Sequence, residues 1–121
     1  MKNAAETGRW GEQIVVDRLR ADGCLIMERN WRYGRYEIDI IALKNECIRF
    51  VEVKTRSASG WSSGEDAIDA VKERALMRAA SAYLARTRSN RPFRFDLAVV
   101  EYRTDGSYEV RYTESIAESH W

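Results

Sequence analysis

Four charged side chains lie within two apolar stretches of the chain, and their types could support metal-dependent hydrolysis. The stretches are YEIDIIAL at 36–43 and IRFVEVK at 48–54. They contain Glu37, Asp39, Glu52 and Lys54. Charged side chains are rarely buried unless they are paired. Mg²⁺ is commonly held by one or two carboxylates together with water and phosphate. Asp39 and Glu52 therefore form a candidate metal site, with Lys54 beside it.

A hairpin would bring these residues together. A turn at Asn45-Glu46 sets Asp39 directly opposite Glu52, with their Cβ atoms about 5 Å apart on one face. Glu37 then lies opposite Lys54. Two facing carboxylates repel each other more strongly as they become buried, so a cation between them is favoured. The alternative is a pair of cross-strand salt bridges at an exposed end of the sheet.

The rest of the sequence predicts the elements that position this hairpin. Apolar residues recur at helical spacing over 4–22 and 65–86. Strands are predicted by the apolar stretches at 24–31, 36–43, 48–54, 93–102 and 108–113. The order α-β-β-β-α-β-β predicts an α/β fold with a mixed five-stranded sheet flanked by helices. We expect residues 1–112 to form a single domain and residues 113–121 to form a C-terminal tail.

Composition narrows the classes of function. The chain has 121 residues and a net charge of +1, so it is not a polycation that binds DNA through total charge. No stretch has the roughly 20 apolar residues of a membrane-spanning helix. The N-terminal residues lack the apolar run of a signal peptide, so we expect a cytoplasmic protein with no membrane partner. Cys24 and Cys47 fit no metal-binding spacing, and we expect two reduced thiols.

Basic and aromatic residues suggest contacts with nucleic acid. RNWRYGRY at 29–36 interleaves arginines with aromatic residues, and RTRSNRPFR at 86–94 is also basic. Arginine binds phosphate well, although each segment could equally be a solvated surface. Trp61 lies in a polar loop, where it could stack on an unpaired base or fold back on the core. We expect nucleic-acid contacts from Arg9, Arg32, Arg35, Arg56, Trp61 and Lys72.

These segments together resemble a known group of nucleases. YEIDIIA and FVEVKTR are similar to the active-site signature of the PD-(D/E)xK nucleases, which have the restriction-endonuclease-like fold. The wider match is to the YraN-like family of bacterial proteins, related to archaeal Holliday-junction resolvases. Its further segments are GRWGEQIVVDRL, ERNWR, AIDAVKERALMRAASAYL and RFDLAVV. The matching segments run in order from Gly8 to about Val100.

The resemblance implies a Mg²⁺- or Mn²⁺-dependent endonuclease acting on DNA, including branched or structured DNA. Asp39, Glu52 and the Val53 carbonyl would be the metal ligands. Lys54 would orient the attacking water or stabilise the transition state. Glu12, in the first helix, would reach the same site. The resolvase-like relatives act as dimers, so a homodimer is expected by analogy.

One position departs from the family pattern and leaves other hypotheses open. Tyr36 stands where the family usually has glycine, and its side chain could alter strand twist or crowd a substrate strand. The alternative hypothesis is a non-catalytic nucleic-acid-binding module that retains the nuclease fold. A third is a scaffold for protein contacts, in which the acidic cluster is salt-bridged architecture. Metal binding separates the first two from the third, and cleavage separates the first from the second.

Overall fold

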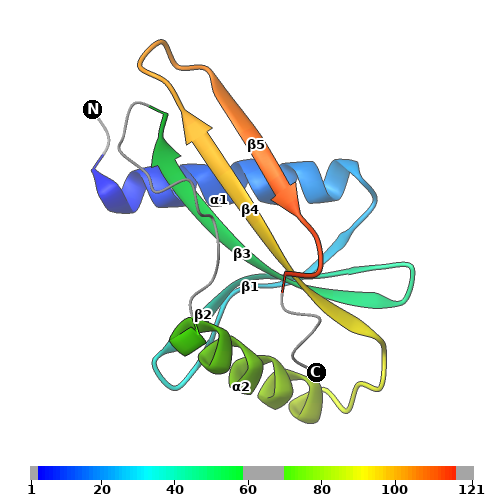
Figure 1. The fold of residues 1–121 in the computed structure, drawn as a ribbon. Helices are drawn as coiled ribbons and strands as arrows, with labels where there is room; N and C mark the ends of the chain where they lie inside the picture. The colour runs from blue at the N-terminus through cyan, green and yellow to red at the C-terminus, as the bar shows by residue number, and fades with distance from the viewer. Residues whose placement is uncertain (1–2, 59–69, 117–121) are drawn as a thin grey trace.

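The computed structural model describes residues 3–58 and 70–116, and its elements follow the predicted order (Figure 1). They are helix α1 (Ala4–Ala21), strands β1 (Leu25–Tyr33), β2 (Tyr36–Lys44) and β3 (Cys47–Ser57), helix α2 (Ala70–Arg86), and strands β4 (Phe93–Tyr102) and β5 (Tyr108–Thr113). The strands form one five-stranded sheet in the order β1-β2-β3-β4-β5. Only β3 and β4 are parallel, so the predicted mixed sheet and α/β class are confirmed. Residues 65–69 of the predicted second helix lie outside the described residues.

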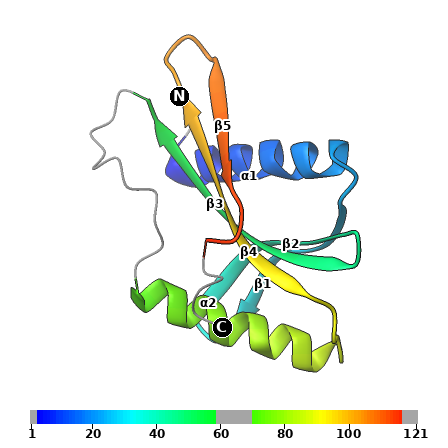
Figure 2. The same ribbon diagram turned by 45° about the vertical axis from the view of Figure 1, so that its right-hand side comes forward.

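The two helices cover opposite faces of the sheet, as the views in Figures 1 and 2 show. Helix α1 buries an apolar stripe at helical spacing against one face, and α2 buries a second stripe against the other. The first core consists of Val15, Val16, Leu19, Cys24, Ile40, Ala42, Val51, Ala98 and Val100. The second consists of Ile38, Ile41, Ile48, Phe50, Leu76, Ala79, Ala80, Tyr83 and Phe95.

Helix α1 begins and ends at recognisable caps and lies close to strand β3. The Asn3 side chain accepts a hydrogen bond of 2.9 Å from the Glu6 amide, which satisfies a free N–H of the first turn. Gly23 follows the helix with φ of 89°, a left-handed conformation that favours glycine. A Cβ on Gly11 would lie 2.0 Å from the Thr55 Oγ1, so only glycine allows this approach.

The β2–β3 hairpin has the predicted turn but a shorter ladder than predicted. Asn45 and Glu46 both have positive φ, 51° and 64°, as a tight two-residue hairpin turn requires. Pairing then follows the predicted register from Lys44–Cys47 to Ile40–Val51. The ladder ends there. The predicted cross-strand pairs Asp39–Glu52 and Glu37–Lys54 are therefore not part of it, and this part of the prediction is wrong.

The alternation of β1 and β2 is broken at the point where this ladder ends. Ile38 belongs to the core under α2 and Ile40 to the core under α1, although residues two apart in a regular strand share a face. On β1, the paired residues Arg29 and Trp31 flank Asn30, which has φ of 53°. Asparagine tolerates this left-handed conformation better than most residues. Asn30 thus marks the irregularity that frees Asp39 from regular pairing.

The segment after β5 is attached to the sheet through a buried aspartate. The Asp96 side chain is fully buried and accepts hydrogen bonds from Arg94, from the Tyr112 hydroxyl at 2.6 Å and from the Ser115 amide at 3.1 Å. The Ile116 amide also donates to the Phe95 carbonyl at 2.8 Å. Residues as far as Ile116 therefore pack on the domain, and 117–121 lie outside the described residues.

Two predictions from composition concern the state of the cysteines and membrane-spanning helices. Cys24 is buried and Cys47 half-buried, and both are free thiols. Across residues 3–58 and 70–116, no helix combines the length and apolar character needed to span a membrane.

Candidate active site

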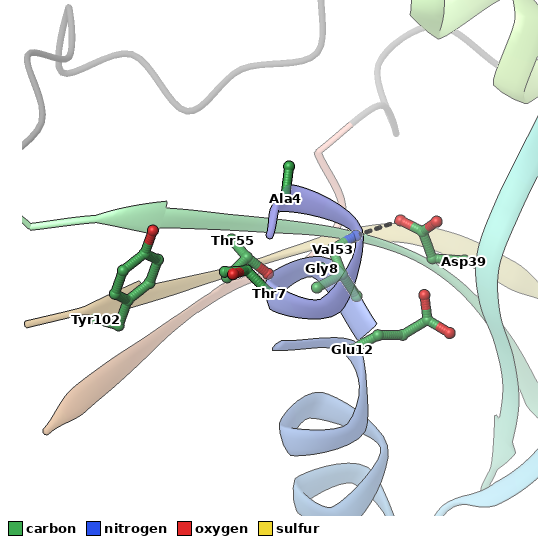
Figure 3. Close-up of a pocket in the computed structure, with 8 residues that line it drawn as sticks. All are labelled: Ala4, Thr7, Gly8, Glu12, Asp39, Val53, Thr55 and Tyr102. Atoms are coloured by element: carbon green, nitrogen blue, oxygen red, sulfur yellow. Dashed lines mark hydrogen bonds between the residues drawn. The ribbon is translucent and has the colours of Figure 1, made fainter. Parts of the chain in front are cut away.

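A cleft of about 370 Å³ lies between the start of α1 and the sheet, and it is bordered by two carboxylates. Asp39 comes from β2 and Glu12 from α1, and Figure 3 shows their side chains on the same side of the helix. The remaining lining residues are Ala4, Thr7, Gly8, Val53, Thr55 and Tyr102. A Cβ on Gly8 would meet nothing within 4 Å, so this glycine leaves the cleft open. The structure thus brings Glu12 and Asp39 to one place.

Asp39 lies where strands β2 and β3 separate. Its Oδ2 accepts a hydrogen bond of 2.8 Å from the Val53 amide (Figure 3). A side chain of β2 is therefore bonded to the backbone of β3 at the point where backbone pairing between the two strands stops. Burial, followed by the charge of Glu52, raises the pKa of Asp39 to about 7. The Val53 hydrogen bond opposes this shift, and the charges of Glu12 and Glu37 add to it. Near neutral pH, this carboxyl therefore favours a proton or a compensating cation.

Glu12 is held in place by residues of β1. Its side chain is only 13% exposed and accepts hydrogen bonds from Asn30 at 3.0 Å and from Arg29 at 3.5 Å. Asn30 also donates to Glu37 at 3.3 Å. The left-handed turn of the backbone at Asn30 thus serves two carboxylates, one from α1 and one from β2.

Glu52 is engaged by Tyr36, the residue that departs from the family pattern. The Tyr36 hydroxyl donates a hydrogen bond of 2.9 Å to Glu52 Oε2. Burial raises the pKa of Glu52, and the Tyr36 hydrogen bond and the charge of Lys72 oppose that increase. Burial and the nearby Glu52 charge also raise the pKa of Tyr36. Tyr36 therefore stays a neutral donor that stabilises the ionised form of Glu52.

Lys54 follows Val53 on strand β3, two residues after Glu52, and it is exposed. Within the described part of the chain it forms no hydrogen bond or ion pair. Its predicted partner Glu37 instead pairs with Arg32 at 3.2 Å. The salt-bridge explanation for Lys54 therefore has no support in the described contacts.

The residues expected to contact nucleic acid occupy several places. Arg35 and Lys72 line one groove between the β1–β2 turn and α2. Arg56 is paired with Glu101 at 3.0 Å, Arg32 is paired with Glu37, and Arg9 is exposed on α1. Trp61 lies outside the described residues. The structure thus groups Arg35 with Lys72 and does not bring the whole set onto one surface.

Sequence reasoning missed two contributors to this region. Asn30 was not recognised as the residue that holds Glu12, although asparagine within a run of strand-forming residues is a signal for a left-handed position. At Tyr36 the sequence shows only a steric departure from the family pattern, and no sequence pattern indicates that its hydroxyl reaches Glu52. Hydrogen bonds of this kind depend on how the strands separate.

The oxygen atoms around the cleft are of the type that a hard cation such as Mg²⁺ prefers as ligands. Their arrangement matches a metal site only in part. Asp39 and Glu12 supply the oxygen ligands that Mg²⁺ prefers, and a cation would offset the burial and the carboxylate repulsion that raise the pKa of Asp39. Glu52 is held by Tyr36. Among residues 3–58 and 70–116, no three His, Cys, Asp or Glu side chains are arranged as a ready metal-binding group.

Fold and site define an α/β protein with a carboxylate-bordered cleft between its first helix and a splayed hairpin. The chain belongs to the family described as "Uncharacterised protein family UPF0102", whose model matches residues 11–100. This is the YraN-like family that the sequence resembles. The matched range includes Glu12, Asp39, Glu52 and Lys54, and it excludes Arg9.

Curated relatives in several bacteria carry the same family name. A UPF0102 protein of Bacteroides thetaiotaomicron is 42% identical over 95 residues, which cover 78% of each chain. One from Chlorobium chlorochromatii is 36% identical over 123 residues, covering 98% of this chain and 94% of the relative. One from Oleidesulfovibrio alaskensis is 46% identical over 94 residues, and the match spans only 46% of that longer relative.

Proposed function

We propose that this protein is a metal-dependent endonuclease that hydrolyses phosphodiester bonds in DNA, including branched or structured DNA. The observation that supports this most directly is the convergence of Glu12 and Asp39 on one cleft, with Glu52 close enough for its charge to raise the pKa of Asp39. The resemblance to the PD-(D/E)xK signature and to the restriction-endonuclease-like fold belongs to the same proposal. So do a cytoplasmic location and a homodimer.

The proposed cofactor is Mg²⁺ or Mn²⁺, held by Asp39, Glu52 and the Val53 carbonyl. When bound, the cation would polarise a phosphoryl oxygen and lower the pKa of a water molecule. Lys54, which has no partner among the described residues, is available to stabilise negative charge that develops on the phosphate. Glu12, fixed by its hydrogen bond from Asn30, would accept a hydrogen bond from water in the cleft.

DNA would be held mainly through its phosphates. The net charge of +1 offers little general attraction, so local cations must supply the contacts. Arg35 and Lys72 occupy one groove, and Arg9 is exposed on the helix that borders the cleft. We include Arg32, Arg56 and Trp61 as further contacts. Arg32 and Arg56 would have to exchange their glutamate partners for phosphate.

The test is a cleavage assay with duplex, single-stranded, flap and four-way DNA in Mg²⁺, in Mn²⁺ and in EDTA. Wild type should cut at least one substrate only when the metal is present. Asp39→Ala should abolish cutting, whereas Asp105→Ala, a matched change in the exposed β4–β5 turn, should not. Equal cutting by wild type and Asp39→Ala would overturn the proposal.

A non-catalytic nucleic-acid-binding module is the second candidate. The observation that favours it is the Tyr36 hydroxyl, which engages a Glu52 oxygen that the nuclease proposal gives to the metal. This candidate predicts DNA binding without cleavage on every substrate. It also predicts no increase in cleavage when Tyr36 is replaced by glycine, the residue that the family usually has there.

A further inference from the structure

A groove separate from the carboxylate cleft runs between the β1–β2 turn and helix α2. It consists of two cavities of about 420 Å³ and about 520 Å³, both lined by Tyr33 and Arg78. Around the first lie Gly34, Arg35, Tyr36, Val71, Lys72 and Ala75. Around the second lie Met77, Ser81 and Ala82. Because both are lined by Tyr33 and Arg78, the two cavities are neighbours along α2, and we refer to the pair as one groove.

The described charged residues that line this groove are all basic. Arg35, Lys72 and Arg78 are exposed along it, and none of the described lining residues is acidic. Lys72 and Arg78 project from the same helix, and Arg35 faces them from the hairpin turn. Cations that flank a groove attract an extended anion such as a nucleic-acid backbone.

An aromatic ring lies at the centre of the groove. Tyr33 lines both cavities and is 39% exposed. The Arg86 guanidinium lies 5.4 Å from the centroid of the Tyr33 ring and 5.5 Å from that of Trp31, and these cation–π contacts hold the ring in place. An ordered, half-exposed ring is a platform on which a nucleobase can stack.

One end of the groove reaches the candidate active site. Tyr36 lines the groove and donates its hydroxyl hydrogen bond to Glu52. Lys72 also lines the groove, and its charge acts on Glu52. A strand lying in the groove would therefore approach Glu52 from the α2 face of the sheet.

We propose that this groove binds an unpaired nucleic-acid strand, with phosphates at Arg35, Lys72 and Arg78 and a base on Tyr33. The proposal rests on the nuclease function above and specifies its substrate as one with unpaired nucleotides. An aromatic platform in a basic groove suits splayed bases, whereas the bases of a duplex are already stacked on each other. An acidic peptide has the same negative charge as a nucleic-acid strand but no bases that could stack on Tyr33.

The test is fluorescence anisotropy with labelled oligo-dT and oligo-rU of about 12 nucleotides, within the range of known single-strand sites. A hairpin duplex is the third probe, unlabelled poly-glutamate is a competitor, and EDTA prevents cleavage. The variants are Tyr33→Ala, Tyr33→Phe and Arg78→Gln. Arg20→Gln, an exposed arginine on the helix that covers the other face, is the matched control.

Wild type should bind the single strands more tightly than the duplex. Tyr33→Ala should weaken that binding roughly tenfold, and Tyr33→Phe should retain it, since stacking needs the ring and not the hydroxyl. Arg78→Gln should lower the salt dependence of binding by about 0.7 in log–log slope. Arg20→Gln should change neither quantity. The ribose and deoxyribose probes decide which strand is preferred.

Three results would overturn the groove proposal: no binding of single strands by wild type, wild-type affinity in Tyr33→Ala and Arg78→Gln, or equal displacement by poly-glutamate. Failure of the nuclease proposal is a different result, because it would appear as intact oligonucleotide binding with no cleavage in Mg²⁺ or Mn²⁺. Cleavage with unchanged binding in the groove variants would instead retain the nuclease and reject the groove. Melting temperatures show that each variant is folded.

Discussion

The Tyr36 hydroxyl lies 2.9 Å from Glu52 Oε2 and connects the end of the β1–β2 turn to a half-buried carboxylate of β3. Its removal leaves that carboxylate without a hydrogen-bond donor among the described residues. Tyr36→Phe should therefore lower the free energy of unfolding by about 1–3 kcal/mol. Tyr33→Phe, which changes an exposed tyrosine on the same turn, should lower it by less than about 0.5 kcal/mol. Urea denaturation measures both values.

A double-mutant cycle shows whether this loss comes from the Tyr36–Glu52 contact itself. Tyr36→Phe and Glu52→Gln should show a coupling energy of about 0.5–3 kcal/mol. If the two changes are additive within error, the hydroxyl does not stabilise Glu52, and the described contact contributes nothing measurable.

The stability of the protein should depend on pH through Asp39. The pKa of Asp39 is 3.8 in its ordinary state and about 7 in the fold. Between these values the folded state binds more protons than the unfolded state, so stability falls as pH rises through this range. Asp39→Asn imitates the protonated form and keeps the Val53 hydrogen bond. At about pH 8 it should be more stable than wild type by on the order of 2 kcal/mol, a difference that disappears below about pH 4.

Asp105 is a control, because its contribution to stability should change with pH in the opposite direction to that of Asp39. Hydrogen bonds from Ser107 lower the pKa of Asp105, so its contribution is present at neutral pH and is lost as pH falls through the acid range. Asp105→Asn should therefore be less stable than wild type at neutral pH. Thermal melts across a pH series, repeated with Mg²⁺, measure these differences. Mg²⁺ should stabilise wild type at about pH 8 and leave Asp39→Asn unchanged; equal effects would refute metal binding at Asp39.

Replacing Lys54 distinguishes a catalytic role for this residue from a purely structural one. Since Lys54 has no described partner, Lys54→Ala should change the free energy of unfolding by less than about 0.5 kcal/mol. In the proposed nuclease, its loss should reduce cleavage by roughly a hundredfold or more while DNA binding is largely kept. Added Mn²⁺ should partly rescue Asp39→Asn and should not rescue Lys54→Ala. Cleavage by Lys54→Ala at the wild-type rate would assign the residue no catalytic role.

Replacing either of two glycines of α1 by alanine should change the stability of the protein, in opposite directions for the two positions. Gly11→Ala places a methyl group against Thr55 and should destabilise the protein by about 1–3 kcal/mol. The second change Thr55→Ala should restore part of this loss by making room. Gly8→Ala enters open space and should stabilise the helix by about 0.5–1 kcal/mol. Guanidinium denaturation of the three variants tests these expectations, and a stable Gly11→Ala would show that α1 can shift on β3.

The elements of this fold could be predicted because their determinants are local. Helical spacing located α1, and Asn45-Glu46 located the hairpin turn, since two successive left-handed residues are needed there. The register followed from the turn as far as Ile40–Val51. Family membership was predictable because its segments occur in order along the chain.

The details of the site could not be predicted because they depend on an interrupted pattern. The predicted register requires that the alternation of β2 continues through Asp39. In the fold, Asn30 takes a left-handed conformation and the Asp39 side chain binds the Val53 amide, so the ladder ends at Ile40–Val51, before the predicted Asp39–Glu52 and Glu37–Lys54 pairs. Asp96 shows the same limit. Its buried side chain accepts hydrogen bonds from Tyr112 and Ser115, residues that only the finished sheet brings to β4.

The irregularity of β1 has a further consequence for how copies of this protein behave in concentrated solution. β1 is an outer strand, and an outer strand with a regular row of free amides and carbonyls is a template for aggregation. The register shift between Ile26 and Glu28 and the left-handed Asn30 interrupt that row twice within nine residues. A second chain therefore cannot hydrogen-bond along the full length of β1. The distortion that orients Asn30 toward Glu12 also protects this edge against fibre-like stacking.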